Sequence, residues 1–176
     1  YLLAWVFMLL GQRPAQYALL KVCDVLAPTF KDGSHIYILR VPRVKQRKAA
    51  RLEFKERLIT PQIGKLLYEH ALKVKTSFEG LLSDPSQAPL FPQTVNRNQP
   101  IGMEFHQTAT LLSSKLTRIL EELEVFSERT GDLIHVTATR FRRTIGTRAA
   151  QEGPGELIIA ELLDHTDNPN VGVYVQ

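Results

Sequence analysis

Apolar residues along most of the chain recur three or four positions apart, which is the spacing of helices. Residues 1–31 are expected to be helical, with a break from Gly11 to Pro14, because proline is tolerated in the first turn of a new helix. Thr60-Pro61 has the form of an N-cap followed by proline at the first helical position. The later predicted helices cover residues 63–74, 112–123, 138–151 and 156–163.

A different pattern predicts a small sheet in the first half of the chain. Asp32-Gly33-Ser34 is a turn signal, and the residues from 35 to 41 that follow it form a predicted strand. From 51 to 58, apolar and charged residues alternate, which is the period of a strand. Residues 35–59 are therefore predicted to form an antiparallel hairpin with a basic connection.

Turn and loop signals complete the picture of the fold. Residues 77–102 contain four prolines and are expected to form a long loop, and Thr130-Gly131-Asp132 is a predicted turn. The length of 176 residues fits one domain, so we expect residues 1–176 to form a single domain. The expected class is mainly α with a small antiparallel β-sheet (α+β). Because the chain begins with Tyr1 rather than Met, we expect a fragment.

The distribution of charge suggests a polyanionic partner. The net charge is only +4, but basic residues gather in two clusters that contain no acid. Clusters of this kind suit DNA, although two solvated basic faces explain them equally well. The first cluster comprises Arg40, Arg43, Lys45, Arg47, Lys48 and Arg51, and the second comprises Arg140, Arg142, Arg143 and Arg148.

Two further features limit the cellular context. Cys23 is the only cysteine, so an internal disulfide is excluded and a reducing compartment is expected. The apolar run over residues 1–10 is too short to span a bilayer, which takes about 20 residues. This run also lacks the basic start of a secretory signal, so a buried helix is the better interpretation.

Chemically capable residues appear late in the chain, and their spacing is informative. Separately, an arginine pair on a helix is usually a solvated face, and a lone histidine or tyrosine is usually structural. Together they form an ordered set: His165 lies 23 residues after Arg142, and Tyr174 lies nine residues after His165.

This arrangement resembles the C-terminal signature of the tyrosine recombinase (phage integrase) family. The run from Arg142 to Thr147 looks like the family's R-[HR]-T-x-[AG]-T, and Leu162-Leu163-Asp164-His165 looks like its L-L-G-H. Upstream, Gly11-Gln12-Arg13-Pro14-Ala15-Gln16 resembles the family's G-x-R-x-x-E motif, with glutamine in place of glutamate. The family's hairpin lysine falls on Lys45, with Lys48 as the rival candidate.

One position departs from the family pattern. The histidine of the family's H-x-x-R motif falls on Thr139, and His135 is four residues too early to replace it. A threonine hydroxyl stays protonated near neutral pH and cannot act as a base in the way that imidazole does. The identity of the general base is therefore open.

The resemblance implies an enzyme that cuts and rejoins DNA without metal or cofactor. Arg13 and Arg142 would hold the scissile phosphate, Tyr174 would attack it, and Lys45 would protonate the leaving 5′-oxygen. His165 would hydrogen-bond the phosphate or help to move a proton. The intermediate would be a 3′-phosphotyrosine, whose bond energy allows rejoining without ATP. DNA contacts are expected from Arg43, Arg47, Lys48, Arg140 and Arg143.

The resemblance also implies a context. The partner would be double-stranded DNA, in integration, excision or transposition of a mobile element. Family members assemble as homo-oligomers, usually tetramers, on DNA. We expect the given chain to lack the family's N-terminal DNA-clamping domain and C-terminal tail, and we expect the fragment to be a monomer. A bacterial cytoplasm or nucleoid, or a phage-encoded origin, is expected, with no membrane partner.

Three alternatives remain open at this point. The chain could be a recombinase-like DNA-binding protein that has lost catalysis, as Thr139 and Gln16 suggest. A type IB topoisomerase shares the chemistry, but the L-L-x-H run resembles integrases more. In the third alternative, the chain is a helical domain whose spacings coincide by accident.

Overall fold

The computed structural model of the chain describes residues 1–44, 51–94, 101–153 and 156–163. It divides into two compact units. The first consists of Tyr1, Leu3–Pro14 and Thr110–Gln176, and the second of Leu2 and Ala15–Ala109.

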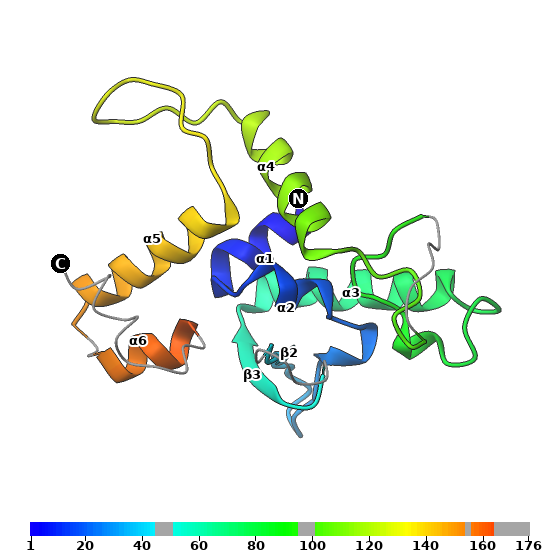
Figure 1. Cartoon of the computed structure of the whole chain (residues 1–176). Helices are drawn as coiled ribbons and strands as arrows, with labels where there is room; N and C mark the ends of the chain where they lie inside the picture. Colours follow the sequence, from blue (N-terminus) through cyan, green and yellow to red (C-terminus); the bar gives the residue numbers. More distant parts are fainter. Residues whose placement is uncertain (45–50, 95–100, 154–155, 164–176) are drawn as a thin grey trace. The chain divides into compact units, whose positions relative to one another are not determined.

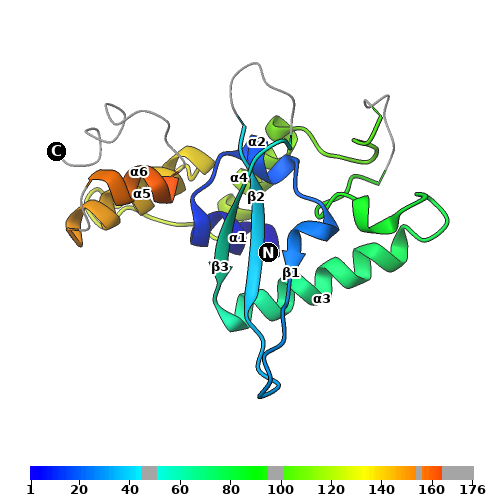
Figure 2. The same ribbon diagram turned by 90° about the horizontal axis from the view of Figure 1, so that it is seen from below.

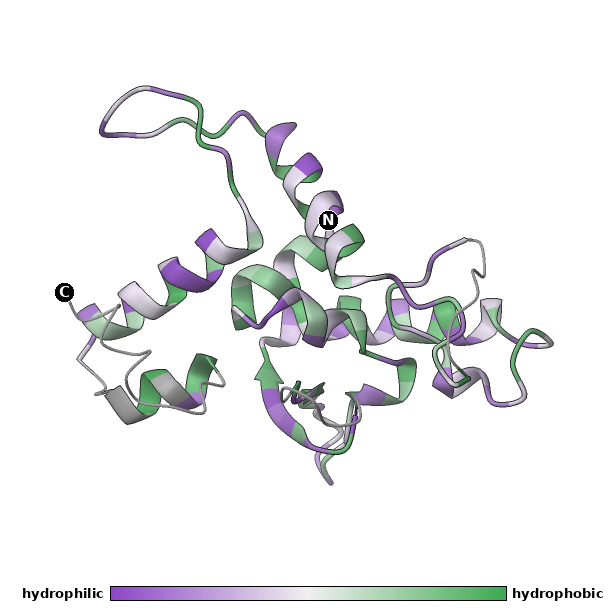
Figure 3. Cartoon of the chain, in the orientation of Figure 1, coloured by the Kyte–Doolittle hydropathy of each residue, from purple (hydrophilic) through white to green (hydrophobic). Residues whose placement is uncertain are grey.

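The first unit is helical. It contains α1 (Leu2–Leu10), α4 (Ala109–Glu121), α5 (Ala138–Gln151) and α6 (Glu156–Leu163). α1 is apolar on every side (Figure 3), and Val6 and Phe7 are fully buried, as expected of a helix without a polar face. α5 begins after Thr137, whose hydroxyl accepts a hydrogen bond from the backbone N–H of Arg140.

The last two helices of this unit pack against each other. α5 and α6 lie side by side (Figure 1), and Ile159 and Leu163 are buried against Ile145, Ala149 and Ala150. Gly153, which follows α5, has a φ of 74° that glycine adopts without strain. This packing fixes the direction in which α6 ends at Leu163.

The second unit is built on a three-stranded antiparallel sheet in the order β1-β2-β3 (Figure 2). The strands are β1 (Val25–Leu26), β2 (Tyr37–Pro42) and β3 (Phe54–Ile59). In the hairpin, Tyr37 pairs with Ile59 and Pro42 pairs with Phe54. The expected hairpin is therefore confirmed, and β1 adds a strand that the sequence pattern did not predict.

A long helix, α3 (Pro61–Ser77), packs on β1 and β2 of this sheet. A Cβ atom at Gly64 would lie 2.3 Å from the Cβ of Tyr37, so only glycine allows the helix to approach β2 at this point. Buried residues on the inner face of α3 complete the core: Leu67, Ala71 and Val74. Short elements connect the larger ones: α2 (Pro14–Ala18), η1 (Val22–Asp24) and η2 (Pro85–Gln87).

Helix bounds agree closely with the sequence pattern in the second half of the chain. Residues 138–151 and 156–163 form α5 and α6 as predicted, and the α+β class is confirmed. The prediction that residues 19–31 are helical is wrong, because this backbone bonds elsewhere. Val22 donates to Ala88 and Leu90 donates to Leu20, and β1 then pairs with β2. None of the helices described is both long and apolar enough to cross a membrane.

Candidate functional site

Arg142 is the central side chain of the candidate site. It lies on the buried face of α5, where only 9% of its surface is exposed. Its Nη1 donates to the carbonyl of Gly11 at 2.9 Å, and its Nη2 donates to the carbonyl of Leu163. A guanidinium carries five N–H donors in a fixed plane, more than these two carbonyls use. Arg142 therefore anchors two backbone segments through one guanidinium group.

The two acceptors of Arg142 belong to the other predicted motifs. Gly11 lies two residues before Arg13, and Leu163 lies two residues before His165. One side chain thus joins three segments that are far apart in the sequence. Gly11 of the G-x-R motif, Arg142 and Leu163 of the L-L-D-H run therefore meet within the first unit.

Gly11 allows the first of these segments to approach α5 closely. Its φ of 57° lies in the left-handed region, and its N–H closes α1 by donating to Phe7. A Cβ atom at this position would lie 2.7 Å from Cδ1 of Ile145 on α5. Two physical constraints therefore favour glycine at this position of the predicted G-x-R motif: the left-handed backbone and the close approach of Ile145.

Gln12 reinforces the same junction. Only 2% of the residue is exposed, and its Nε2 donates to the carbonyl of Leu10 at 2.9 Å. The same Nε2 donates to the carbonyl of Leu162 at 2.8 Å. Sequence reasoning treated this position as the variable residue of its motif, and no local pattern reveals a partner that lies 150 residues away.

The remaining predicted site residues that the structure describes differ from Arg142 in being exposed or partly exposed. Arg13 is exposed, between α1 and α2. Thr139, Arg140 and Arg143 are exposed on α5, in contrast to buried Arg142. His135 precedes α5, and its Nδ1 lies 3.0 Å from the carboxylate of Glu121. The other predicted site residues lie outside the described residues: Lys45, Arg47, Lys48, His165 and Tyr174.

Gln16, which stands where the family has glutamate, is buried with 1% exposure. Its Nε2 donates to the carbonyl of Pro42 at 3.1 Å, at the end of β2. A glutamate carboxylate could not donate this bond. The glutamine at this position therefore ties α2 to the end of β2, just before the basic connection of the hairpin.

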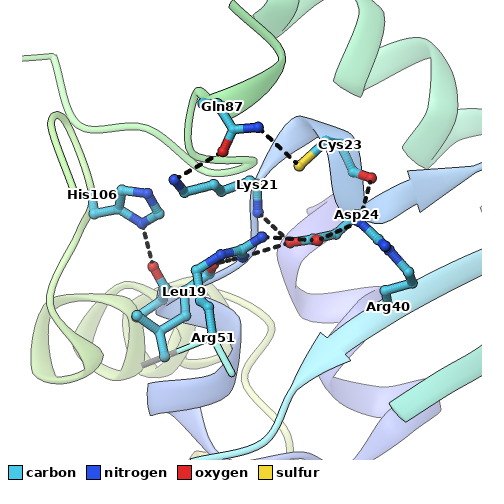
Figure 4. A network of polar contacts seen from close by, with 9 residues as sticks. Leu19, Lys21, Cys23, Asp24, Arg40, Arg51, Gln87 and His106 are labelled. Atoms are coloured by element: carbon cyan, nitrogen blue, oxygen red, sulfur yellow. Dashed lines mark hydrogen bonds and ion pairs between the residues drawn. The ribbon is translucent and has the colours of Figure 1, made fainter. Parts of the chain in front are cut away.

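Two arginines of the basic hairpin contact an acidic residue of η1, which the sequence pattern did not indicate. Asp24 has a fully buried side chain, and Arg51 meets it with two hydrogen bonds of 2.7 and 3.0 Å (Figure 4). Arg40 lies 3.5 Å from the same carboxylate, and the backbone N–H of Lys21 donates to it at 2.8 Å. Arg40 and Arg51 thus share a single carboxylate within the second unit.

Arg43, a predicted DNA contact, is half-buried beside Glu53. Its Nη1 lies 3.5 Å from a Glu53 carboxylate oxygen, and its backbone N–H donates to the carbonyl of Glu53 at 2.8 Å. Together with Arg51, this pair fixes both backbone ends next to residues 45–50. The basic cluster expected from the sequence therefore includes arginines that have local acidic partners.

Burial shifts the pKa of three groups around Asp24. Burial, followed by the nearby charge of Arg51, lowers the pKa of Lys21, whose Nζ donates to Gln87 at 3.2 Å. Burial raises the pKa of the Cys23 thiol, so the thiol form is favoured. Burial also lowers the pKa of His106, whose Nδ1 lies 2.7 Å from the carbonyl of Ala18. Burial thus favours the neutral form of all three groups.

Comparison with solved structures identifies the fold. A crystal structure of XerA recombinase has a TM-score of 0.65 and 15% identity, over 100% of this chain and 51% of that chain. A structure of XerH site-specific recombinase bound to difH substrate, in a pre-cleavage complex, has a TM-score of 0.61 and 18% identity, over 99% and 42% of the two chains. The structure of XerH bound to palindromic difH substrate, in a post-cleavage complex, has a TM-score of 0.60 and 18% identity, over 98% of this chain and 40% of that chain.

This chain thus spans about half, or less, of the length of the recombinases that it matches. No protein-family model matches the chain, and no curated relative matches it in sequence. At these identities the likeness concerns the fold. The predicted resemblance is confirmed at that level: the chain has the fold of a tyrosine recombinase catalytic domain.

Proposed function

We propose that the chain is the catalytic domain of a site-specific tyrosine recombinase, which cuts and rejoins double-stranded DNA through a 3′-phosphotyrosine on Tyr174. The observation that carries the proposal is the pair of bonds from Arg142 to Gly11 and Leu163. These bonds bring Gly11, two residues before Arg13, and Leu163, two residues before His165, to a common arginine. Accidental spacing in a helical domain gives no reason for such convergence.

In this mechanism Arg13 and Arg142 bind the non-bridging oxygens of the scissile phosphate. Attack on a phosphodiester increases the negative charge on these oxygens, and guanidinium groups meet them with paired, charge-assisted hydrogen bonds. A preorganised donor of this kind contributes roughly 3–4 kcal/mol to the transition state. Arg142 is preorganised by its buried position on α5.

Tyr174 attacks the phosphorus, and the bond to the 5′-oxygen breaks. A tyrosine has a pKa of about 10 and is mostly protonated near neutral pH, so the arginine charges must favour the phenolate. Lys45, with Lys48 as the alternative, gives its proton to the leaving 5′-oxygen. His165 hydrogen-bonds the phosphate or helps to move the proton from Tyr174, while Thr139 at most donates a hydrogen bond.

DNA contacts outside the reacting phosphate would come from basic side chains near these motifs. Arg140 and Arg143 are exposed on α5, on either side of Arg142 in the sequence. Arg43, Arg47 and Lys48 would contribute contacts from the hairpin. The cytoplasm as location, integration or transposition as the pathway, and a tetramer on DNA for the full-length protein belong to the same proposal.

The test is incubation with a nicked suicide DNA substrate, in which the cut strand is lost and the covalent adduct accumulates. Because the target site is unknown, substrates are drawn from the DNA that flanks the gene. We expect a protein–DNA adduct that resists denaturation and is absent in Tyr174→Phe. An adduct that survives this substitution would show that the nucleophile is another residue.

A second candidate function is a recombinase-like DNA-binding protein without catalysis. Thr139 favours it, because it stands where the family has histidine and lies exposed on α5. This candidate predicts salt-dependent DNA binding, with affinity falling linearly on a logarithmic salt scale, and no adduct on a site that the protein binds. An adduct with any DNA would exclude it.

A further inference from the structure

A pocket in the second unit has a buried lysine in its wall. The pocket has a volume of about 270 Å³, and its walls come from Lys21, from η2 and the residues just before it, and from the segment that begins at Ile101. Small-molecule sites usually measure about 300–1,000 Å³, so this pocket suits a small ligand. None of the described residues that line it belongs to the set proposed for DNA cleavage.

Lys21 is the unusual residue of this pocket, because only 6% of its surface is exposed. Lysine is almost never buried to this extent unless it is paired. Its Nζ donates to Oε1 of Gln87 at 3.2 Å (Figure 4). Within the described part of the chain this is the one hydrogen bond of the ammonium, and no carboxylate forms an ion pair with it. An ammonium has three N–H donors, so two remain for a partner in the pocket.

Gln87 orients this ammonium but cannot balance its charge. The amide of Gln87 is neutral, and its Nε2 is engaged with Sγ of Cys23 at 3.8 Å, which leaves Oε1 for Lys21 (Figure 4). Burial, and then the charge of Arg51, lowers the pKa of Lys21, because the surrounding protein compensates the positive charge only in part. An anionic ligand group beside Nζ would complete the compensation that a buried charge requires.

Two carboxylates that line the same pocket restrict what such a ligand can be. Asp84 accepts a hydrogen bond from the backbone N–H of Ser86, and Glu104 accepts one from that of Gly102, each at 2.9 Å. These bonds lower the pKa of both carboxyl groups, so both are charged near neutral pH. They would repel a ligand that carries negative charge alone. A ligand that also carries a positive group would match both signs of charge.

We propose that this pocket binds a small zwitterion of the amino-acid type: Lys21 meets the ligand's carboxylate, and Glu104 meets its ammonium group. Glu104 has this role rather than Asp84 because its charge acts on Lys21, which places the two groups near each other. Leu82 and Ile101 also line the pocket, and 99% of Ile101 is exposed. An apolar side chain on the ligand would cover this surface and remove it from water.

The first experiment compares three related probes on the unaltered chain. L-leucine carries both charges and an apolar side chain, 4-methylpentanoate lacks the ammonium group, and 3-methylbutylamine lacks the carboxylate. Titration followed by NMR should show that leucine shifts the backbone amide signals of Lys21 and Gly102 in a saturable way. The other two probes should bind at least about 10-fold more weakly, because each loses one charge-assisted interaction. No saturable shift with leucine, or equal affinities for the three probes, would overturn the proposal.

Lys21→Met tests the contact with the carboxylate. Methionine has a similar length but no charge, so the affinity for leucine should fall about 10- to 100-fold. Urea unfolding establishes that the variant is folded. The matched control is Lys73→Met, because Lys73 is an exposed lysine of α3 in the same unit, and it should keep the wild-type affinity. Unchanged affinity in folded Lys21→Met, or equal losses in both variants, would contradict the role of Lys21.

Glu104→Gln tests the contact with the ammonium group and leaves the buried lysine in place. Glutamine can still accept the hydrogen bond from Gly102, but it carries no charge. The preference for leucine over 4-methylpentanoate should therefore fall about 10-fold. Glu56→Gln is the control, since Glu56 is exposed on β3, and it should keep the preference. An unchanged preference in Glu104→Gln would overturn the zwitterion proposal, and this result is decisive even if Lys21→Met does not fold.

Discussion

At the scale of single residues, Gly11 shows how one position serves both backbone geometry and packing. Its left-handed φ of 57° ends α1, and the absence of a side chain leaves room for Ile145 on α5. Both features bring the carbonyl of Gly11 to Arg142. A change here should therefore affect stability through two separable causes.

Gly11→Ala should destabilise the chain by about 2 kcal/mol or more, because a left-handed alanine costs roughly 1–2 kcal/mol before any clash. Urea unfolding measures the change. Gly131→Ala is the control: its φ is 73°, but a Cβ there would meet nothing within 4 Å. Ile145→Val removes the clashing Cδ1, so the double variant should lose less than the two single variants combined. If the losses of unfolding free energy in the two single variants simply add in the double variant, the clash between the new Cβ and Ile145 does not contribute.

At the residue scale, spacing alone singles out Arg142, and its role in the reaction stays a prediction. Arg142 was singled out by its distance from His165 and Tyr174, and the structure gives it a central position. Its acceptors could not be predicted, because backbone carbonyls carry no side-chain signal. Gln12 and Asp24 were missed for the same reason: their partners are brought close only by the fold.

At the scale of elements, the buried carboxylate of Asp24 holds together η1, β2 and Arg51, which lies three residues before β3. Arg51 and Arg40 both bond to it, and both guanidinium groups lie over the ring of Phe54, at 5.1 and 5.3 Å from its centre. Stacking of this kind adds to the attraction between the charges. The group thus fixes where the hairpin connection ends.

Asp24→Asn should be strongly destabilising, because it keeps the volume but leaves Arg51 without a charged partner, with only 13% of its side chain exposed. Breaking a buried ion pair in this way costs about 3–5 kcal/mol. The free energy of unfolding in urea measures it. Glu53→Gln is the control, since that carboxylate is 42% exposed and its pair with Arg43 should contribute less than about 1 kcal/mol. Similar losses for both variants would contradict this account.

Element prediction was accurate where local signals agree and failed where long-range pairing decides. α5 has an N-cap threonine, and α6 lies after a glycine-proline-glycine break, so both helices could be bounded from sequence. The segment after Ala18 has enough apolar residues for a helix. Its backbone instead pairs with Ala88 and Leu90, and a local sequence pattern carries no information about partners so far away in the chain.

At the scale of the whole molecule, burial of His106 links stability to pH. Its Nδ1 bonds to Ala18, and its pKa lies below the ordinary value. The unfolded chain therefore binds a proton more readily than the folded chain. The full stability is present above the unfolded pKa of about 6.5 and falls as the pH drops toward the folded pKa.

We therefore expect the free energy of unfolding to be lower at pH 5.5 than at pH 7.5. In His106→Asn, which keeps a donor near the position of Nδ1, this difference should shrink. Urea unfolding at the two pH values measures both. His35→Asn is the matched control, because His35 is exposed. An unchanged pH difference in His106→Asn would show that other groups cause the acid sensitivity.

The bond from Gln12 to Leu162 spans 150 residues, and this separation has a consequence for synthesis on the ribosome. The second unit is nearly continuous in the chain, so it can fold while translation proceeds. The first unit needs residues from both of its segments. At about 5–20 residues per second, apolar α1 would wait roughly 8–30 seconds for α6 to emerge. During that interval the buried apolar residues of α1 lack the late part of the chain with which they share the first unit.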